Sequence, residues 1–182
     1  APAREIGWHG NWGMAASKKE NDFYSILSQR LSNKYPGIQI KSKNIADFEA
    51  EYWMYDFAKF DEYATYNADL LILRIGENVN SARFSEHDFK LAYGKLIEHF
   101  RSINPTVKII AAGTFWNQGD KDLLMKSVAS DKGIPFVNLF DLSNFSKNMA
   151  LGQFDNMGVA THPSDEGMLQ IADRLWSAIL SL

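Results

Sequence analysis

The chain contains no cysteine, little proline and no long hydrophobic run, and its charges nearly balance. It has five prolines among 182 residues, and no apolar run exceeds four residues, as in Leu70 to Leu73. Without cysteine there are no disulfides, thiolate metal sites or cysteine nucleophiles. A membrane span needs about 20 apolar residues, so none is expected. With 19 basic and 22 acidic side chains the formal charge is −3, which lacks the basic footprint of a nucleic-acid-binding protein.

What remains is the composition of an ordinary globular protein. Hydrophobic residues make up 46% of the chain and charged residues 23%, both close to the average for soluble domains. A chain of this length can bury a sizeable core as one domain. Because it shows no internal repeat and no linker, residues 1–182 are predicted to form a single domain.

Apolar residues at helical spacing predict helices along most of the chain. Ser17 and Glu20 form a capping-box pattern, which predicts a helix that begins at Ser17 and ends near Tyr35. Ser85 is predicted to open another helix, which stops before Asn104 because a proline follows. Further helices are expected over about 47–62, over about 118–131 and from Ser164 to the C-terminus.

Four segments between these helices are predicted to be strands: 38–43, 69–75, 107–112 and 135–139. Residues 69–75 and 107–112 are almost continuously apolar, which is typical of strands covered on both faces. Strands that alternate with helices predict a parallel sheet in a doubly wound α/β domain. Ligands bind at the carboxyl ends of the strands in such a sheet, so the loops that follow the strands are the places to seek a site.

Gly76 and Asn78 follow the most apolar of these strands directly. A glycine lets the chain turn sharply there, and the asparagine then presents an amide N–H over the edge of the sheet. Such a donor suits an oxyanion hole, because it stabilises a developing alkoxide without carrying charge. The alternative is an asparagine that ties down its own loop.

His162 precedes the last helix, and Pro163 fixes the backbone beside it. A histidine so placed can act as a general base near neutral pH, although a structural role is the alternative. The histidines show no pair with metal-ligand spacing, so no metal site is predicted.

The segments 72–79 and 159–168 together resemble the SGNH hydrolases, also called GDSL-like esterases. Gly-Glu-Asn in the first segment resembles that family's third block, and His-Pro in the second resembles its fifth. The stretch 6–17 resembles a subgroup of secreted or carbohydrate-associated bacterial members. The likeness extends over most of the chain, and the order and spacing of its short motifs are the specific part.

The resemblance implies a flavodoxin-like three-layer α/β/α fold with a parallel sheet in the strand order 2-1-3-4-5. It makes His162 the general base and Asn78 an oxyanion-hole donor, with Gly76 shaping the turn before it. The family's second block supplies a glycine N–H. The matching region 44–49 has no glycine, so the backbone N–H of Ala46 or a neighbour takes that part. The implied reaction uses no cofactor.

Several aromatic residues lie in segments that read as loops. Trp116 is the candidate for substrate binding, and Trp8, Trp12 and Phe154 would join it in a rim that faces a sugar. Aromatic residues over the edge of a core would give the same pattern.

Two departures from the family pattern concern the catalytic residues. The family's acid stands three residues before the histidine, where this chain has Val159. Asp155 and Asp165 are the nearby carboxylates, and Asp165 is interpreted as a residue that caps or charges the helix N-terminus. A dyad whose ring is oriented by a backbone carbonyl is the alternative.

The second departure is that no Gly-Asp-Ser or Gly-Asn-Ser motif occurs. The resemblance places Ala1 just after the turn that carries the nucleophilic serine. The sheet predicted above also lacks the central strand, which would leave ladder groups unpaired. We therefore expect the chain to be N-terminally incomplete. The alternative is that its first residues fill the gap.

The function implied is that of a serine esterase acting on short acyl esters, such as acetyl groups on a carbohydrate. A hydrolase-like module that has lost its nucleophile and only binds such ligands is the alternative. A flavin or receiver-type flavodoxin fold fits less well, because Asp69 lies at the start of a strand rather than at its end. The resemblance favours a secreted or periplasmic protein, and the sequence leaves the oligomeric state open.

Overall fold

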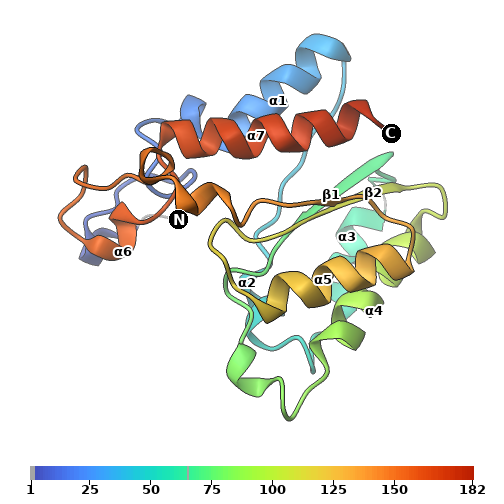
Figure 1. The fold of residues 1–182 in the computed structure, drawn as a ribbon. Coiled ribbons are helices and arrows are strands. Elements are labelled where there is room, and N and C mark those ends of the chain that lie inside the picture. Colours follow the sequence, from blue (N-terminus) through green and yellow to red (C-terminus); the bar gives the residue numbers. More distant parts are fainter. Residues whose placement is uncertain (1–2, 65) are drawn as a thin grey trace. The chain divides into compact units, whose positions relative to one another are not determined.

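The structure, a computed structural model, describes residues 3–64 and 66–182 (Figure 1). The chain divides into two compact units. Unit 1 consists of the described residues up to Ser42 together with Leu139–Ser181, and unit 2 consists of Lys43–Asn138 with Leu182. The prediction of a single domain concerns how these two units associate, and it stays a prediction.

Unit 2 contains a three-stranded parallel sheet in the order β1-β2-β3. The strands are β1 (Leu70–Arg74), β2 (Lys108–Ala112) and β3 (Phe136–Val137). They confirm the parallel α/β sheet expected from residues 69–75, 107–112 and 135–139, although β3 is shorter than predicted. The five-stranded order 2-1-3-4-5 stays a prediction.

The strand predicted over 38–43 is not formed in the part of the chain that the structure describes. These residues have no regular secondary structure, and Ile38 is 40% exposed. Alternating apolar residues do not make a strand by themselves, because an extended segment also needs a neighbour that pairs with its N–H and C=O groups.

The helices of unit 2 are α2 (Ala46–Ala50), α3 (Asp61–Ala64), α4 (Phe89–Ile103) and α5 (Asp120–Asp131). The single helix predicted over 47–62 is therefore wrong, because the chain turns between α2 and α3 and Asp56 caps a new 3-10 turn there. Similarly, α4 begins after Asp88 rather than at Ser85. The Asp88 carboxylate accepts the N–H of Leu91 at 2.9 Å, whereas a cap at Ser85 is not formed.

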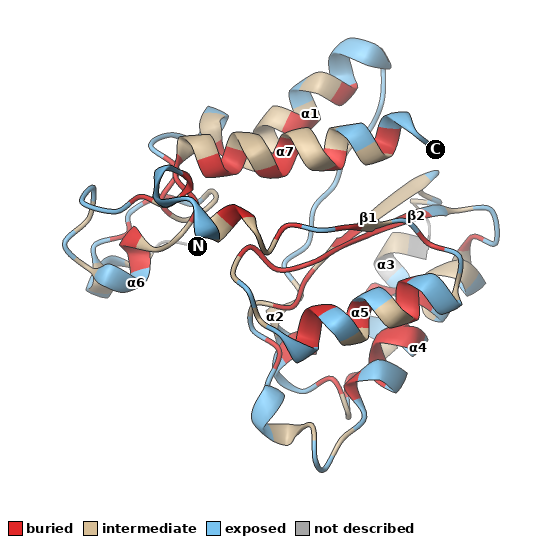
Figure 2. Cartoon of the chain, viewed as in Figure 1, coloured by how far each residue is buried: buried red, intermediate tan, exposed pale blue. Residues whose placement is uncertain are grey.

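The core of unit 2 lies between the sheet and the helices α4 and α5, which run side by side (Figure 1). Leu73 and Ile75 from the first strand and its end, and Ile109 and Ala111 from β2, alternate toward this core. Figure 2 shows mostly buried residues along β2, mostly half-buried residues along β1, and exposed residues on the outer faces of both helices. Residues of the sheet and of both helices thus share one apolar core.

Unit 1 is built on the helices α1 (Phe23–Lys34), α6 (Met157–Ala160) and α7 (Asp165–Leu180). α7 has the predicted start, because the hydroxyl of Ser164 accepts the N–H of Gly167 at 3.2 Å. The predicted start of α1 is wrong. Asp22 caps α1 by accepting the N–H of Ser25, and Ser17 bonds elsewhere.

α1 and α7 pack on each other, with Leu27 and Leu31 of α1 buried (Figure 1). Arg30 and Asp173 form an ion pair of 2.7 Å at this contact. A separate apolar cluster contains Trp8, Ala15, Ala150 and Val159. Throughout residues 3–64 and 66–182, no helix is long and apolar enough to cross a membrane.

Candidate functional site

The turn after β1 places Gly76, Glu77 and Asn78 at the carboxyl end of the strand. Gly76 has a φ of +124°, which side chains other than glycine rarely adopt. A Cβ at this position would lie 2.6 Å from Cγ2 of Thr114 and 2.8 Å from Cε of Met125. Both the backbone conformation and the close neighbours therefore require glycine at position 76.

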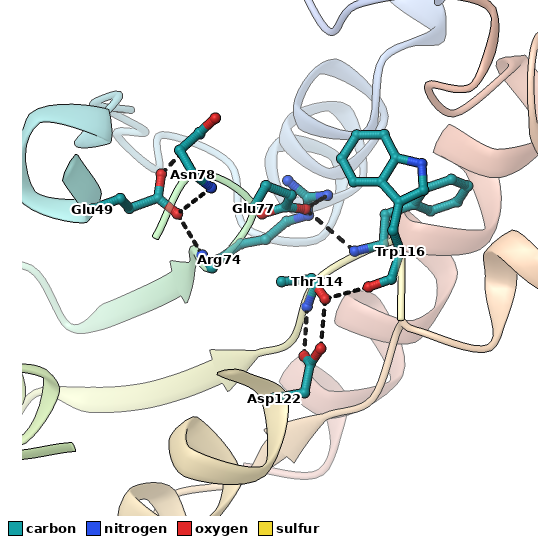
Figure 3. A network of polar contacts seen from close by, with 9 residues as sticks. Glu49, Arg74, Glu77, Asn78, Thr114, Trp116 and Asp122 are labelled. Atoms are coloured by element: carbon teal, nitrogen blue, oxygen red, sulfur yellow. Dashed lines mark hydrogen bonds and ion pairs between the residues drawn. The ribbon is translucent and has the colours of Figure 1, made fainter. Parts of the chain in front are cut away.

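A buried carboxylate from α2 holds this turn (Figure 3). Oε1 of Glu49 accepts the backbone N–H of Gly76 at 2.5 Å and that of Asn78 at 3.3 Å. Oε2 of Glu49 accepts the side-chain amide of Asn78 at 3.0 Å. One hydrogen of Nδ2 is thereby used, and the other is available to a ligand.

The turn after β1 is joined to the loop after β2. Oε1 of Glu77 accepts from the Arg74 guanidinium at 2.7 Å and from the N–H of Phe115 at 3.3 Å (Figure 3). Thr114 in the same loop donates its N–H and its hydroxyl to Asp122 of α5, at 2.8 and 2.6 Å. Charged hydrogen bonds thus fix both loops at this edge of the sheet.

Lys121 is a buried cation at the start of α5, and only 7% of it is exposed. Burial lowers the pKa of Lys121, while the carboxylates of Glu49, Glu77 and Asp122 act in the opposite direction. A lysine near a helix N-terminus is also disfavoured by the helix dipole. Both burial and the helix dipole disfavour a positive charge at position 121. A lysine kept there marks this edge of the sheet as a candidate site.

Ala46 and Trp116, the other residues that the sequence suggested here, have definite partners. The N–H of Ala46 donates to Oδ1 of Asn44 at 2.9 Å, so the proposed oxyanion donor is engaged in a turn. Trp116 is half-buried and lies edge-on to Phe115, with ring centroids 5.6 Å apart. Its carbonyl oxygen lies 2.5 Å from Oγ1 of Thr114, so it shares with Asp122 the one hydrogen of that hydroxyl.

His162 belongs to unit 1, in the loop between α6 and α7. Its Nδ1 lies 2.6 Å from the carbonyl oxygen of Gly158. The backbone oxygen of His162 accepts the N–H of Ala150 at 3.0 Å, and the N–H of Ser164 donates to Asn148 at 2.9 Å. Residues 148–150 thus hold the loop that contains His162 at the start of α7.

The structure also places Val159, Asp155 and Asp165, the residues that the sequence brought into question as partners of His162. Val159 is fully buried in the apolar cluster of unit 1, so a carboxylate there would lose its hydration. Asp155 is exposed. Asp165 accepts from Ser17 and from Asn21. Burial raises the pKa of Asp165, but the hydrogen bonds from Ser17 and Asn21 lower it, and the pKa lies below its usual value.

The aromatic residues predicted to form a rim do not all lie at the surface. Trp8 is 4% exposed and packs edge-on against both Trp12 and Phe154, which are half-buried. Trp8 is therefore a core residue, and its place in the rim is wrong.

Asn78 and His162 lie in different units, so their meeting in one pocket stays a prediction. Among the residues that the structure describes, no group of three or more histidine or acidic side chains is placed to hold a metal ion.

The sequence did not indicate the carboxylates that hold the loops of unit 2, chiefly Glu49, Glu77 and Asp122, or the buried Lys121. Glu49 bonds a residue 29 positions away and Glu77 one 38 positions away, which no local spacing predicts. The one available signal was Glu49 beside Phe48 in an aromatic segment, because a carboxylate among apolar neighbours needs partners.

The chain has a structural relative among known proteins. No family model and no curated protein matches the chain. One crystal structure is similar to it with a TM-score of 0.58, over 95% of this chain and 91% of that chain, at 16% sequence identity. A likeness at this identity shows the fold alone. The residue roles therefore depend on the geometry described above.

Proposed function

We propose that this protein is a serine esterase of the SGNH type that hydrolyses short acyl esters, with an acetylated sugar as its expected substrate. His162 takes the proton of a serine hydroxyl as the oxygen attacks the ester carbonyl, and then gives it to the leaving alcohol. Asn78 donates to the oxyanion of the tetrahedral intermediate. Water attacks the acyl-enzyme in a second cycle and releases the acid.

The observation that carries this proposal is the contact between Nδ1 of His162 and the carbonyl oxygen of Gly158. A carbonyl oxygen only accepts, so Nδ1 bears the hydrogen and the lone pair of the neutral ring lies on Nε2. A general base needs this tautomer, which an aspartate selects in Ser-His-Asp triads. The carbonyl of Gly158 thereby supports His162 as the base, although Val159 stands where the family has its acid.

None of the 182 residues carries the family's serine motif, so the proposal leaves the nucleophile to be identified by labelling. Ser17 is the serine within the resembling stretch 6–17, and its hydroxyl donates to Oδ2 of Asp165 at 2.6 Å. A hydroxyl engaged with a carboxylate of α7 is not in contact with the imidazole that would activate it.

The test uses the full-length natural protein with an aryl acetate and a peracetylated monosaccharide as substrates. We expect His162→Ala to lower kcat by about 10³-fold or more, as removal of the base of a nucleophile–base pair does. His87→Ala is the matched control, because His87 stacks on Trp53 with ring centroids 4.4 Å apart and takes no part in the proposed reaction. It should retain the wild-type rate within about threefold.

A fluorophosphonate probe and mass spectrometry then identify the nucleophile. Stoichiometric labelling of one serine other than Ser17 supports the proposal, and labelling of Ser17 contradicts its exclusion as the nucleophile. If the folded protein binds the acetylated sugar without turnover or labelling, it is the binding module that the sequence left as the alternative.

A further inference from the structure

We propose that Glu49 is the positioning residue of the active site, which sets the direction in which Asn78 donates to the oxyanion. This inference rests on the function proposed above and assigns a role to a residue that the resemblance leaves without one. It is carried by three hydrogen bonds and by the burial of the carboxylate.

Glu49 orients the side-chain amide of Asn78. This side chain is exposed, and an exposed amide normally samples several orientations. Oε2 of Glu49 accepts only, so it selects Nδ2 over Oδ1 and fixes which end of the amide faces inward. The second hydrogen of Nδ2 then has a defined direction, which an oxyanion donor needs because it must not reorganise during the reaction.

Glu49 also holds the backbone of the same turn. Oε1 of Glu49 accepts the N–H groups of Gly76 and Asn78, so both oxygens of one carboxylate hold the turn. The carbonyl of Glu49 also accepts the N–H of Asn80 at 3.3 Å. Because α2 supplies all these acceptors, the position of Asn78 is fixed by an element other than its own strand.

The negative charge of Glu49 has a nearby positive charge that compensates it, that of Lys121. A buried carboxylate is costly unless an opposite charge lies near it, and Glu49 is 5% exposed. Lys121 lies one helical turn before Met125, whose side chain reaches the turn at Gly76. Two neighbouring charged residues have contacts of their own: Arg74 contacts Glu77, and Asp122 contacts Thr114. Glu49 is first among the carboxylates that raise the pKa of Lys121 against burial.

Glu49→Gln is the informative variant, because it keeps the size of the side chain and replaces one acceptor by a donor. If the Gln oxygen accepts from Gly76, its NH2 group faces the NH2 group of Asn78. The Asn78 amide then turns over to present Oδ1, and its donor leaves the oxyanion. In the full-length protein we expect kcat for an aryl acetate to fall about 10- to 100-fold, with KM within about threefold.

A double-mutant cycle separates positioning from a general structural role. Asn78→Ala alone should lower kcat by about 10²- to 10³-fold, and E49Q added to it should cost less than about threefold more, because its target is gone. Equal losses in both backgrounds, or a wild-type kcat in folded E49Q, overturn the positioning role. If Asn78→Ala leaves kcat unchanged, or the wild type shows no esterase activity, the proposed function fails.

A compensated variant, a matched control and an NMR measurement keep the test decisive. If E49Q does not fold because Lys121 loses its compensating charge, E49Q/K121M restores neutrality and takes its place in the cycle. The matched control is Asn104→Ala, because Asn104 is a buried polar residue that bonds Ala68 and Thr106 at the opposite ends of β1 and β2. It should lower stability and leave kcat unchanged. NMR exchange of the Asn78 side-chain amide should be faster in E49Q, and equal exchange overturns the contact itself.

Discussion

Two buried tyrosines in unit 2 have hydroxyl groups in opposite situations. Tyr52 and Tyr93 both pack against Phe89, with ring centroids 5.2 and 6.0 Å away. The hydroxyl of Tyr52 donates to the carbonyl of His87 at 3.2 Å. The hydroxyl of Tyr93 has no partner among the residues described, and burial raises the pKa of Tyr93. A hydroxyl buried without a partner costs stability that its ring does not recover.

We therefore expect Tyr93→Phe to leave the free energy of unfolding unchanged or to raise it by up to about 1 kcal/mol. Tyr52→Phe, the control at a residue of the same type and burial, should lower it by about 1 kcal/mol. Urea unfolding followed by circular dichroism measures both. A loss of more than about 1 kcal/mol in Tyr93→Phe would show that its hydroxyl has a buried water as partner.

Single residues differ in how well the sequence predicts them. Gly76 was predictable because its role follows from backbone conformation next to a strand end. Asp165 was correctly taken as a residue of the helix N-terminus, but its partners Ser17 and Asn21 lie 148 and 144 residues away. Glu49 was not predicted for the same reason. A hydrogen bond made across the fold leaves no periodic mark in the sequence.

The elements were predicted best where burial and a local cap agree. α7 begins at the predicted Ser164 cap and carries a continuous apolar face. α1 begins six residues later than predicted, because Asp22 offers a cap as good as that of Ser17 and the tertiary contact with Asp165 takes Ser17 away. The strand predicted over 38–43 failed because pairing depends on a neighbour that spacing does not reveal.

α7 is also fixed by an ion pair that depends on pH. Both oxygens of Asp141 accept from Arg174 of α7, at 2.5 and 2.8 Å. The hydrogen bond from Arg174 lowers the pKa of Asp141 against the effect of burial. A carboxyl group whose pKa is lower in the folded state contributes stability above its unfolded pKa of about 3.9, and loses it as the pH falls through the folded value.

Asp141→Asn should accordingly lower the free energy of unfolding by about 0.5–1 kcal/mol at pH 7, since solvent screens a pair that is about one third exposed. The variant and the wild type should converge as the pH falls through the lowered folded pKa of Asp141. Urea unfolding at pH 7 and at acid pH measures this. Asp173→Asn, which removes the single contact with Arg30, is the control with a smaller expected effect. An equal loss from Asp141→Asn at both pH values contradicts the assignment.

At the scale of the molecule, each unit has an apolar core of its own, so a lesion in one unit should be felt there first. Gly76→Ala is the lesion for unit 2. The new Cβ clashes with Thr114 and Met125, and we expect a loss of about 2–4 kcal/mol in the opening free energy of the amides of α4. The amides of α7 should change much less.

Native-state hydrogen exchange measures both helices in one experiment. Gly37→Ala is the control, because Gly37 lies in unit 1 with a φ of +85° and no atom within 4 Å of the added Cβ. It should cost only about 1 kcal/mol, from the backbone conformation alone. If Gly76→Ala lowers the protection of α4 and α7 equally, the two units unfold as one, and the single domain predicted from the sequence is supported.

The pairing of α1 with α7 also matters during synthesis on the ribosome. The 130 residues between Lys34 and Asp165 must be translated before the partner of α1 begins to emerge. At about 5–20 residues per second this takes roughly 6–26 s, far longer than a helix needs to form. During that time Leu27 and Leu31 have no α7 to cover them. The nascent chain therefore exposes a chaperone-accessible apolar stripe until its last helix is made.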